Sequence, residues 1–213
     1  MSAKTSLSEL DLICKQAQEA KIDLRRSSKA KKNDALKYAA EFLLKNKAKL
    51  IDANTIDMEL ASQKDLQDSF VDRLELNEKR IDSMISGLDK VINLDDPVGQ
   101  TDQPHTSPSG FEVSKMRVPL GVIGIIYESR PNVTADASAL CLKSGNACIL
   151  RGGSEAANSN AVIEECMQDG LDKASLPKYS IQLIKNQDRK LVGEMIKRCL
   201  LYTSDAADDI RCV

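Results

Sequence analysis

Short apolar runs alternate with longer amphipathic segments over the second half of the sequence. Val122–Tyr127 is an apolar run typical of a buried strand. A helix can begin soon after it at Pro131, because proline is tolerated at the first helical position. The other elements predicted here are helices at Ala135–Ser144, Ala156–Lys173 and Asp188–Lys197 and strands at Ala147–Leu150 and Ser180–Ile184. Strands that alternate with helices predict βαβ units, and therefore a parallel sheet in an α/β fold.

The first half of the sequence predicts helices only. Aromatic residues make up 3% of the chain and Trp is absent, so the core must be built from aliphatic side chains, which pack readily in helices. Ser27 or Ser28 can cap one helix and Asn77 another. Further helices are predicted at about Leu7–Arg25, Ala48–Gln63 and Ser69–Leu74. The residues expected to face inward are Leu10, Ile13, Cys14, Ala17, Ile22, Ala35, Leu36, Ala39, Leu43, Leu44, Ile81, Met84, Ile85, Leu88 and Val91.

Prolines and glycines crowd the segment between Asp95 and Gly110, which therefore cannot form a long helix. We interpret this segment as a connector. The single histidine, His105, lies within it and is expected to be an exposed loop residue rather than a general base. Beyond the connector, Glu112–Val118 alternates enough to predict an extended strand.

Composition excludes several classes of protein. Thirty Lys plus Arg residues against 32 Asp plus Glu residues give a formal net charge of -2, which argues against a nucleic-acid partner. Six cysteines without a CxxC pair or a histidine cluster predict reduced thiols and no metal site. No apolar run approaches the ~20 residues of a membrane span, so we expect a cytoplasmic protein without a membrane partner.

The end of the predicted strand Ala147–Leu150 carries the most informative polar residues. Arg151, Gly152, Gly153 and Ser154 place a basic side chain, two flexible residues and a hydroxyl group there. In doubly wound folds the ligand lies outside the carboxyl ends of the strands, where an arginine can accept the 2′-phosphate of NADP. The sequence therefore favours NADP over NAD. The alternative is an ordinary turn with a solvated arginine.

A second polar group follows the preceding strand, on the same expected edge of the sheet. Arg130 could pair with a carboxylate or phosphate of a substrate, and the amide of Asn132 could donate to a developing oxyanion. Alternatively, Asn132 caps the following helix and Arg130 pairs with Glu128. Convergent polar groups on one edge favour a binding site.

Two long motifs resemble a known family. The stretches VPLGVIGIIYESRPNVT (Val118–Thr134) and CLKSGNACILRGGSE (Cys141–Glu155) closely resemble the gamma-glutamyl phosphate reductases. This family, also called glutamate-5-semialdehyde dehydrogenases, belongs to the aldehyde dehydrogenase superfamily. Supporting stretches are Asp72–Leu74, Asp95–Gly99 and Asn186–Arg189, and the likeness extends from about Leu7 to Lys197.

The resemblance implies NADPH-dependent reduction of gamma-glutamyl phosphate to glutamate 5-semialdehyde in proline biosynthesis. In this family a cysteine thiolate displaces phosphate, and hydride from NADPH reduces the resulting thioester. The loop that holds the adenosine end of the cofactor would be Arg151–Ser154. The segment between cofactor and active centre would supply Tyr127 and Glu128 for the cofactor and Arg130 and Asn132 for the substrate.

The sequence departs from the family pattern after Arg198. The family continues there with a strand, an Arg-Gly-Gly turn and a catalytic domain that carries the nucleophilic cysteine. The resemblance therefore predicts an amino-terminal fragment with helices and connector over residues 1–110, a partial NADP-binding domain over 111–198 and a disordered, non-family tail over 199–213. No cysteine here matches the nucleophile, so no catalytic residue is assigned.

The predicted fold is thus α/β, with amino-terminal helices and an incomplete doubly wound parallel sheet of the aldehyde dehydrogenase type. Two alternatives to a reductase fragment remain. One is a truncated module that binds a nucleotide or a partner without catalysis. The other is the reductase part of a bifunctional pyrroline-5-carboxylate synthase. Homo-oligomerisation of the full-length parent is left open.

Overall fold

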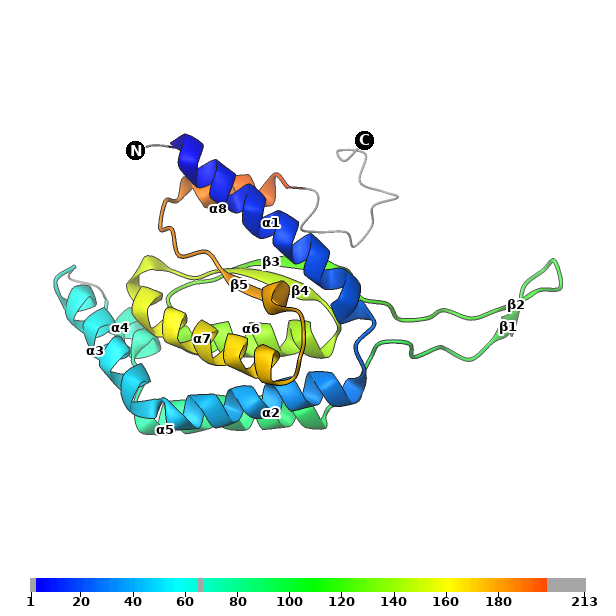
Figure 1. The fold of residues 1–213 in the computed structure, drawn as a ribbon, viewed down its shortest axis with the longest axis horizontal. Coiled ribbons are helices and arrows are strands. Elements are labelled where there is room, and N and C mark those ends of the chain that lie inside the picture. Colours follow the sequence, from blue (N-terminus) through cyan, green and yellow to red (C-terminus); the bar gives the residue numbers. More distant parts are fainter. Residues whose placement is uncertain (1–2, 65–66, 199–213) are drawn as a thin grey trace.

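The computed structural model describes residues 3–64 and 67–198, and the predicted disorder of residues 199–213 lies outside this part (Figure 1). The helices are α1 (Ala3–Arg25), α2 (Lys29–Lys45), α3 (Lys47–Ser62), α4 (Asp68–Leu74), α5 (Glu78–Asn93), α6 (Pro131–Lys143), α7 (Ala157–Lys173) and α8 (Lys190–Ile196). The strands are β1 (His105–Thr106), β2 (Glu112–Val113), β3 (Val122–Ile126), β4 (Ala147–Arg151) and β5 (Ile181–Leu183).

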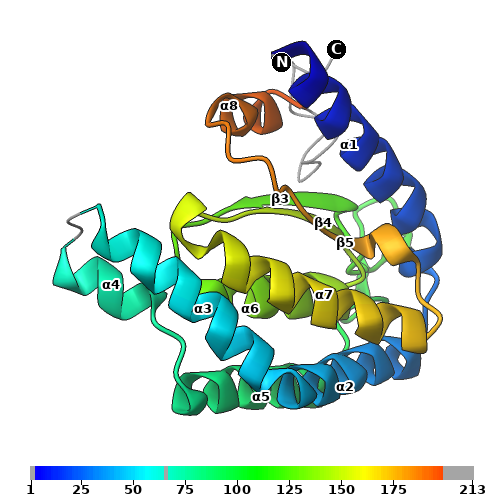
Figure 2. The same ribbon diagram turned by 60° about the vertical axis from the view of Figure 1, so that its left-hand side comes forward.

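The predicted parallel sheet is present, with strand order β3-β4-β5. Helices α1 and α8 lie over one face of this sheet and α6 and α7 over the other, so the fold is doubly wound (Figures 1 and 2). Helices α2 and α5 pack on the outer side of α6 and α7 and form a further layer. The amino-terminal helices and the sheet therefore share one continuous buried cluster.

Strand β3 corrects one prediction. The run Val122–Tyr127 was expected to be a buried strand, but β3 is half-exposed, with Ile126 44% exposed. Among the described residues β3 has a neighbouring strand on one side only, whereas β4 lies between two strands and is buried along its whole length. The apolar run alone does not distinguish these two positions.

Local signals in the helical half are confirmed. Ser28 caps α2 by accepting from the amide of Lys31, and Asn77 caps α5 in the same way. Two inward-facing assignments are wrong, because Ile22 and Leu44 are about half exposed. Leu43 is fully buried, and consecutive residues of a helix project about 100° apart, so its neighbour Leu44 turns toward solvent.

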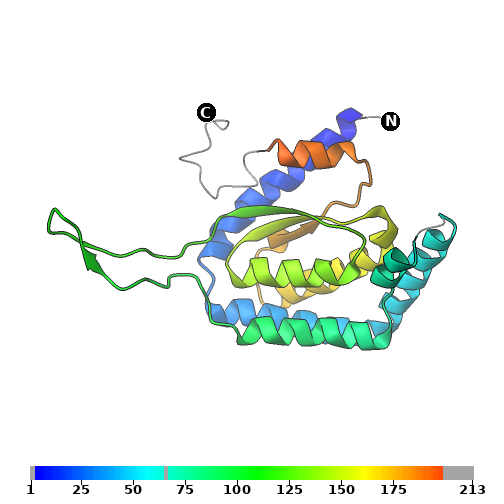
Figure 3. The ribbon, with the colours of Figure 1, turned by 180° about the vertical axis from the view of Figure 1, so that it is seen from behind.

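The connector forms a projecting arm rather than a simple loop. Strands β1 and β2 pair antiparallel, with His105 opposite Val113, and the arm extends away from the layers (Figure 3). The predicted strand Glu112–Val118 is thus only two residues long, and His105 lies in a strand, although it is exposed as expected. A two-stranded ribbon without a core of its own supports little regular pairing.

A buried ion pair fixes the foot of this arm. Lys32 Nζ lies 2.6 Å from Asp96 Oδ2 and also donates to the carbonyl of Lys143 at 3.0 Å. The other carboxylate oxygen of Asp96 accepts from the amide of Val98 at 3.0 Å. Because Lys32 is 1% exposed, its charge needs this partner inside the protein.

The four described cysteines occupy the core, as their positions predict. Cys14, Cys141 and Cys166 lie on buried helical faces and Cys148 lies in β4. None of the described helices is long and apolar enough to cross a membrane.

Candidate functional site

The carboxyl ends of β3 and β4 bring the two predicted groups of polar residues together. Ile126 is the register partner of Arg151, and the amide of Tyr127 donates to the carbonyl of Arg151 at 3.1 Å. The segments that follow the two strands therefore leave the sheet side by side. This juxtaposition confirms that the predicted residues share one edge.

Arg151 is buried rather than solvated, so the interpretation of an ordinary surface turn is wrong. Its side chain donates to the carbonyl of the neighbouring Gly152, and the residue is 5% exposed. Its Nε atom has no hydrogen-bond partner, and no carboxylate of the described residues lies within ion-pair distance. Burial lowers the pKa of Arg151. The edge thus holds a buried guanidinium group whose Nε atom has no partner among the described residues, although the nearby Glu155 carboxylate acts on its charge without forming an ion pair.

The two glycines after Arg151 allow a close approach of backbone to side chains. A Cβ atom on Gly152 would overlap the Asn160 amide and lie 3.0 Å from the Tyr127 ring. A Cβ atom on Gly153 would overlap the hydroxyl of Ser129. Neighbouring atoms of the chain therefore leave no room for a side chain at either position, which explains why both residues are glycine.

Glu155 ties the ends of the two strands together. Its carboxylate accepts from the hydroxyl groups of Ser129 and Ser154, each at 2.9 Å, and Lys64 Nζ lies 3.2 Å away. Burial acts against the charge, but the hydrogen bonds from Ser154, Ser129 and Lys64 prevail and lower the pKa of Glu155 to about 2. The hydroxyl of Ser154, a predicted cofactor ligand, is thus engaged with its neighbour.

Tyr127 belongs to a chain of hydrogen bonds behind the glycines. Its hydroxyl lies 2.8 Å from Thr134 Oγ1, which donates to Asn160 Oδ1 at 2.8 Å. Since the Thr134 proton is used in that bond, the Tyr127 hydroxyl is the donor. Burial raises the pKa of Tyr127 to about 12, so the phenol stays protonated at neutral pH.

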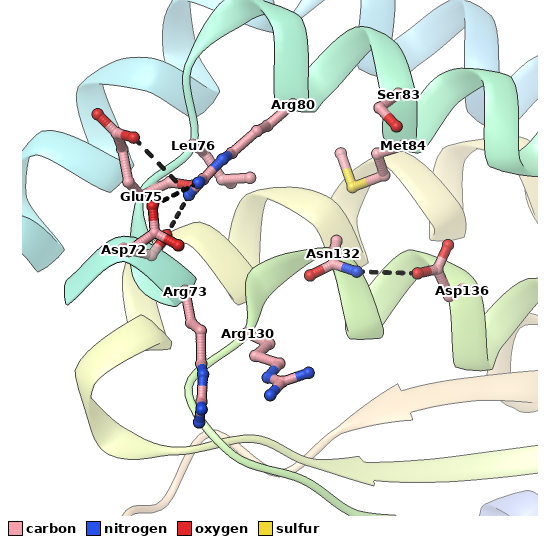
Figure 4. A pocket seen from close by; sticks show the side chains of 10 residues that line it. All are labelled: Asp72, Arg73, Glu75, Leu76, Arg80, Ser83, Met84, Arg130, Asn132 and Asp136. Atoms are coloured by element: carbon pink, nitrogen blue, oxygen red, sulfur yellow. Dashed lines mark hydrogen bonds and ion pairs between the residues drawn. The ribbon is translucent and has the colours of Figure 1, made fainter. Parts of the chain in front are cut away.

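A pocket of ≈ 350 Å³ lies beside this edge, between α4, α5 and α6 (Figure 4). Both predicted substrate residues, Arg130 and Asn132, line it. The remaining lining residues come from the earlier helices and from α6: Asp72, Arg73, Glu75, Leu76, Arg80, Ser83, Met84 and Asp136. The pocket therefore combines the post-β3 segment with helices from the first half of the chain.

The structure shows which interactions the predicted pocket residues make within the chain. Arg130 Nε lies 3.9 Å from Glu128 Oε2, so the expected pair with Glu128 is present. Asn132 does not cap α6, since its amide instead donates to Asp136 Oδ2 at 3.0 Å. Glu128 is also 3.4 Å from Arg73 Nη1. Glu128 does not line the pocket itself, but it contacts two arginines that do.

Comparison with known proteins assigns the family. The model of the aldehyde dehydrogenase family matches residues 2–199. This chain belongs to the aldehyde dehydrogenase family. It is 47% identical over 191 residues to a gamma-glutamyl phosphate reductase of Clostridium botulinum, covering 90% of this chain and 46% of that protein. This aldehyde dehydrogenase chain thus spans less than half the length of the curated relatives that it matches.

Solved structures agree with this assignment. Gamma-glutamyl phosphate reductase from Thermotoga maritima is 45% identical, with a TM-score of 0.84 over 88% of this chain and 45% of that one. The Saccharomyces cerevisiae reductase is 33% identical, with a TM-score of 0.77 over 84% of this chain and 46% of that one. The predicted helix-rich α/β architecture of an aldehyde dehydrogenase is confirmed.

The aldehyde dehydrogenase fold implies a nicotinamide dinucleotide cofactor. Such a cofactor is anionic, and the buried Arg151 at the carboxyl edge, whose Nε atom has no partner within residues 3–64 and 67–198, suits an anionic group. The residues present therefore fit this class of cofactor. When bound, the cofactor supplies hydride chemistry, while Arg151 and the loop after it would hold its adenosine end.

Sequence reasoning missed the residues that position this loop. Asp57 of α3 caps α7, accepting from the amides of Asn158 at 3.1 Å and Ser159 at 2.8 Å. Asn54 donates to the Ser159 hydroxyl at 3.1 Å. A signal existed: Asn54 and Asp57 continue the helical spacing of the buried residues Leu50, Ala53 and Ala61. Polar residues at inward positions of a helix indicate tertiary hydrogen bonds.

Proposed function

We propose that the complete protein catalyses NADPH-dependent reduction of gamma-glutamyl phosphate to glutamate 5-semialdehyde, a step of proline biosynthesis. The proposal is supported by relatives of that name at 47% identity and by the solved reductases with the same fold. The structural observation that carries it is the buried Arg151, whose Nε atom has no partner in the described part of the chain, beside a pocket that Arg130 lines. The proposed function also implies that the substrate is a small molecule and that the protein acts in the cytoplasm.

We assign the cofactor specificity to the edge after β4. In this proposal Arg151 binds the 2′-phosphate of NADP by donating hydrogen bonds to it. Gly152, Gly153 and Ser154 hold the adenosine end. Tyr127 and Glu128 lie on the neighbouring segment, between cofactor and substrate. In support, the Tyr127 ring packs where a Gly152 side chain would be, so the loop and this segment form one surface.

We assign substrate binding to the pocket beside this edge. The guanidinium group of Arg130 is about half exposed, so it is accessible to an anionic substrate group. Asn132 lies exposed on the first turn of α6, with its amide directed at Asp136. An amide donor and a guanidinium group within one pocket suit a substrate that carries carboxylate and phosphate groups.

Two measurements test this function. The complete coding sequence should restore growth without proline to a bacterium that lacks gamma-glutamyl phosphate reductase. The chain itself should bind NADPH saturably in calorimetry, with NADH as the weaker ligand. Failure to restore growth while the protein accumulates would contradict the activity, and stronger binding of NADH would contradict the cofactor assignment.

A further inference from the structure

The pocket between α4, α5 and α6 contains charged groups of both signs. Its cationic residues are Arg73, Arg80 and Arg130. Its carboxylates are Asp72, Glu75 and Asp136. A site for a simple anion needs no carboxylates, because they repel the ligand. A balanced lining instead suits a ligand that carries a positive and a negative group close together.

One of the three arginines is committed to the protein itself. Arg80 Nη2 lies 2.7 Å from Asp72 Oδ1, and Nη1 donates to the carbonyl of Glu75 at 3.0 Å (Figure 4). These bonds join the end of α4 to the start of α5. Arg80 therefore forms the wall of the pocket, and its donors are used before a ligand arrives.

The other two arginines share a single carboxylate. Glu128 Oε2 lies 3.4 Å from Arg73 Nη1 and 3.9 Å from Arg130 Nε, and both arginine side chains are nearly half exposed. Two guanidinium groups therefore share one carboxylate, whereas Arg80 has two, Asp72 and Glu75. Carboxylates pair strongly with such guanidinium groups, so an external carboxylate can bind here.

Asp136, which also lines the pocket, is a carboxylate that lacks a cationic partner in the part of the chain that the structure describes. It is half-buried on α6, accepts from the Asn132 amide, and faces α5 where a Cβ on Gly87 would lie 3.3 Å from its Oδ1. Among the described residues it has no cation within ion-pair distance. Burial raises the pKa of Asp136, although the Asn132 hydrogen bond opposes this. An external ammonium group would supply the missing counter-charge.

We propose that this pocket binds the α-amino acid end of the substrate, with the α-carboxylate at Arg73 and Arg130 and the α-ammonium at Asp136. The inference rests on the proposed function, because gamma-glutamyl phosphate carries both groups on one carbon. Arg130 stands at the N-cap of α6 and Asp136 lies six residues further, about 9 Å along the helix axis. Binding at both residues therefore requires the Arg130 side chain to leave Glu128 and extend along α6 toward Asp136.

In this arrangement Glu128 competes with the ligand for the two arginines. Its carboxylate contacts both arginines in the position proposed for the ligand carboxylate. It therefore competes with the ligand for the same donors. Removing its charge should strengthen binding, whereas removing Arg130 or Asp136 should weaken it.

The experiment uses three stable probes in NMR titrations of the chain. L-Glutamate carries the whole α-amino acid group, glutarate lacks the ammonium, and 4-aminobutanoate lacks the α-carboxylate. We expect L-glutamate to bind at least tenfold more tightly than either analogue. Asp136→Asn should weaken L-glutamate about tenfold and leave glutarate unchanged, and Arg130→Met should weaken both.

Matched variants outside the pocket serve as controls. Asp52→Asn on the exposed side of α3 and Arg117→Met at the base of the arm should leave all three affinities unchanged. Glu128→Gln should bind L-glutamate about threefold more tightly than the unaltered chain. This gain cannot come from misfolding, so it tests the site even where Asp136→Asn impairs folding.

Three results would overturn the proposal: no saturable binding of L-glutamate, equal losses for L-glutamate and glutarate in Asp136→Asn, or weaker binding in Glu128→Gln. None of these measurements involves a dinucleotide or turnover. The proposed function fails separately, when the coding sequence does not restore growth without proline. If the chain prefers L-glutamate but the complete coding sequence does not restore growth, the amino acid site is supported and the proposed reaction is refuted.

Discussion

A buried arginine without a described carboxylate at ion-pair distance, such as Arg151, is a costly feature in a protein interior. A ligand that supplies an anionic group would offset the free-energy cost of burying this charge. The same residue could be identified from the sequence, because it ends a predicted strand of a parallel sheet. Its burial could not, since that depends on how the loop packs against the segment after β3.

Arg151→Ala tests the role of this charge. We expect NADPH affinity to fall about ten- to a hundredfold, the value of a charge-assisted pair with a phosphate, and NADH affinity to fall much less. Titration calorimetry with both dinucleotides measures the difference. Since the substitution also alters a buried position, the NADH arm reports any general loosening of the edge. Equal losses for the two dinucleotides would refute the assignment.

Glu155 predicts a specific pH dependence of stability. Its folded pKa of about 2 lies below the ordinary 4.5, so its stabilising effect is fully present above pH 5 and is lost as the pH falls toward 2. Allowing for partial screening by solvent, Glu155→Gln should lower the free energy of unfolding by about 1 kcal/mol at pH 7. Urea unfolding at pH 7 and pH 3 measures this, and an undiminished difference at pH 3 would contradict it.

At the scale of elements, the packing of α2 against α7 depends on a glycine inside a helix (Figure 2). A Cβ atom on Gly170 would lie 2.6 Å from the carbonyl oxygen of Ala35 and 2.8 Å from the amide nitrogen of Ala39. Glycine lowers helix propensity, so its presence here reflects the close approach of the two backbones. The sequence pattern of α7 alone does not reveal this approach.

Gly170→Ala should therefore destabilise the protein, although alanine is the better helix former. We expect a loss of about 1–3 kcal/mol in the free energy of unfolding, because the two helices must separate. Gly193→Ala in α8 is the matched control, since a Cβ there meets no atom within 4 Å. That change should stabilise by up to about 1 kcal/mol. Thermal and urea unfolding of both variants would show the opposite signs, and matching signs would disprove the explanation.

The elements that the sequence predicts correctly are those set by local chemistry. The caps Ser28 and Asn77 and the start of α6 at Pro131 depend on residues within one turn. The candidate site is predictable only in part, because two of its components come from distant segments. Arg73 and Arg130 meet at one carboxylate although 57 positions separate them. Only the packing of α4 and α5 against α6 brings them together.

At the scale of the whole molecule, the described thiols are poorly suited to covalent catalysis. Burial raises the pKa of Cys14, and burial raises the pKa of Cys166 to about 11. A hydrogen bond from Cys148 lowers the pKa of Cys141, and the same bond raises the pKa of Cys148, but both thiols are enclosed in the core and lack access to a substrate. An enzymatic nucleophile needs both access and a lowered pKa.

A protein of residues 1–213 should therefore bind NADPH without reductase turnover. The assay is phosphate-dependent NADP reduction with glutamate 5-semialdehyde, run beside Cys→Ala variants at all six positions. We expect no rate above background in any of these proteins. Turnover that one variant abolishes would identify a cysteine as the nucleophile and refute the structural interpretation of that thiol.

The arm joins two halves of a common interior without contributing to it. The buried cluster draws on residues before Asn93 and after Gly121, while the intervening arm supplies none. A protease that cuts after the exposed Lys115 would therefore release no domain. It would leave two peptides whose buried residues belong to one shared cluster. The gene could accordingly be divided at this point into two separately translated parts that reassemble.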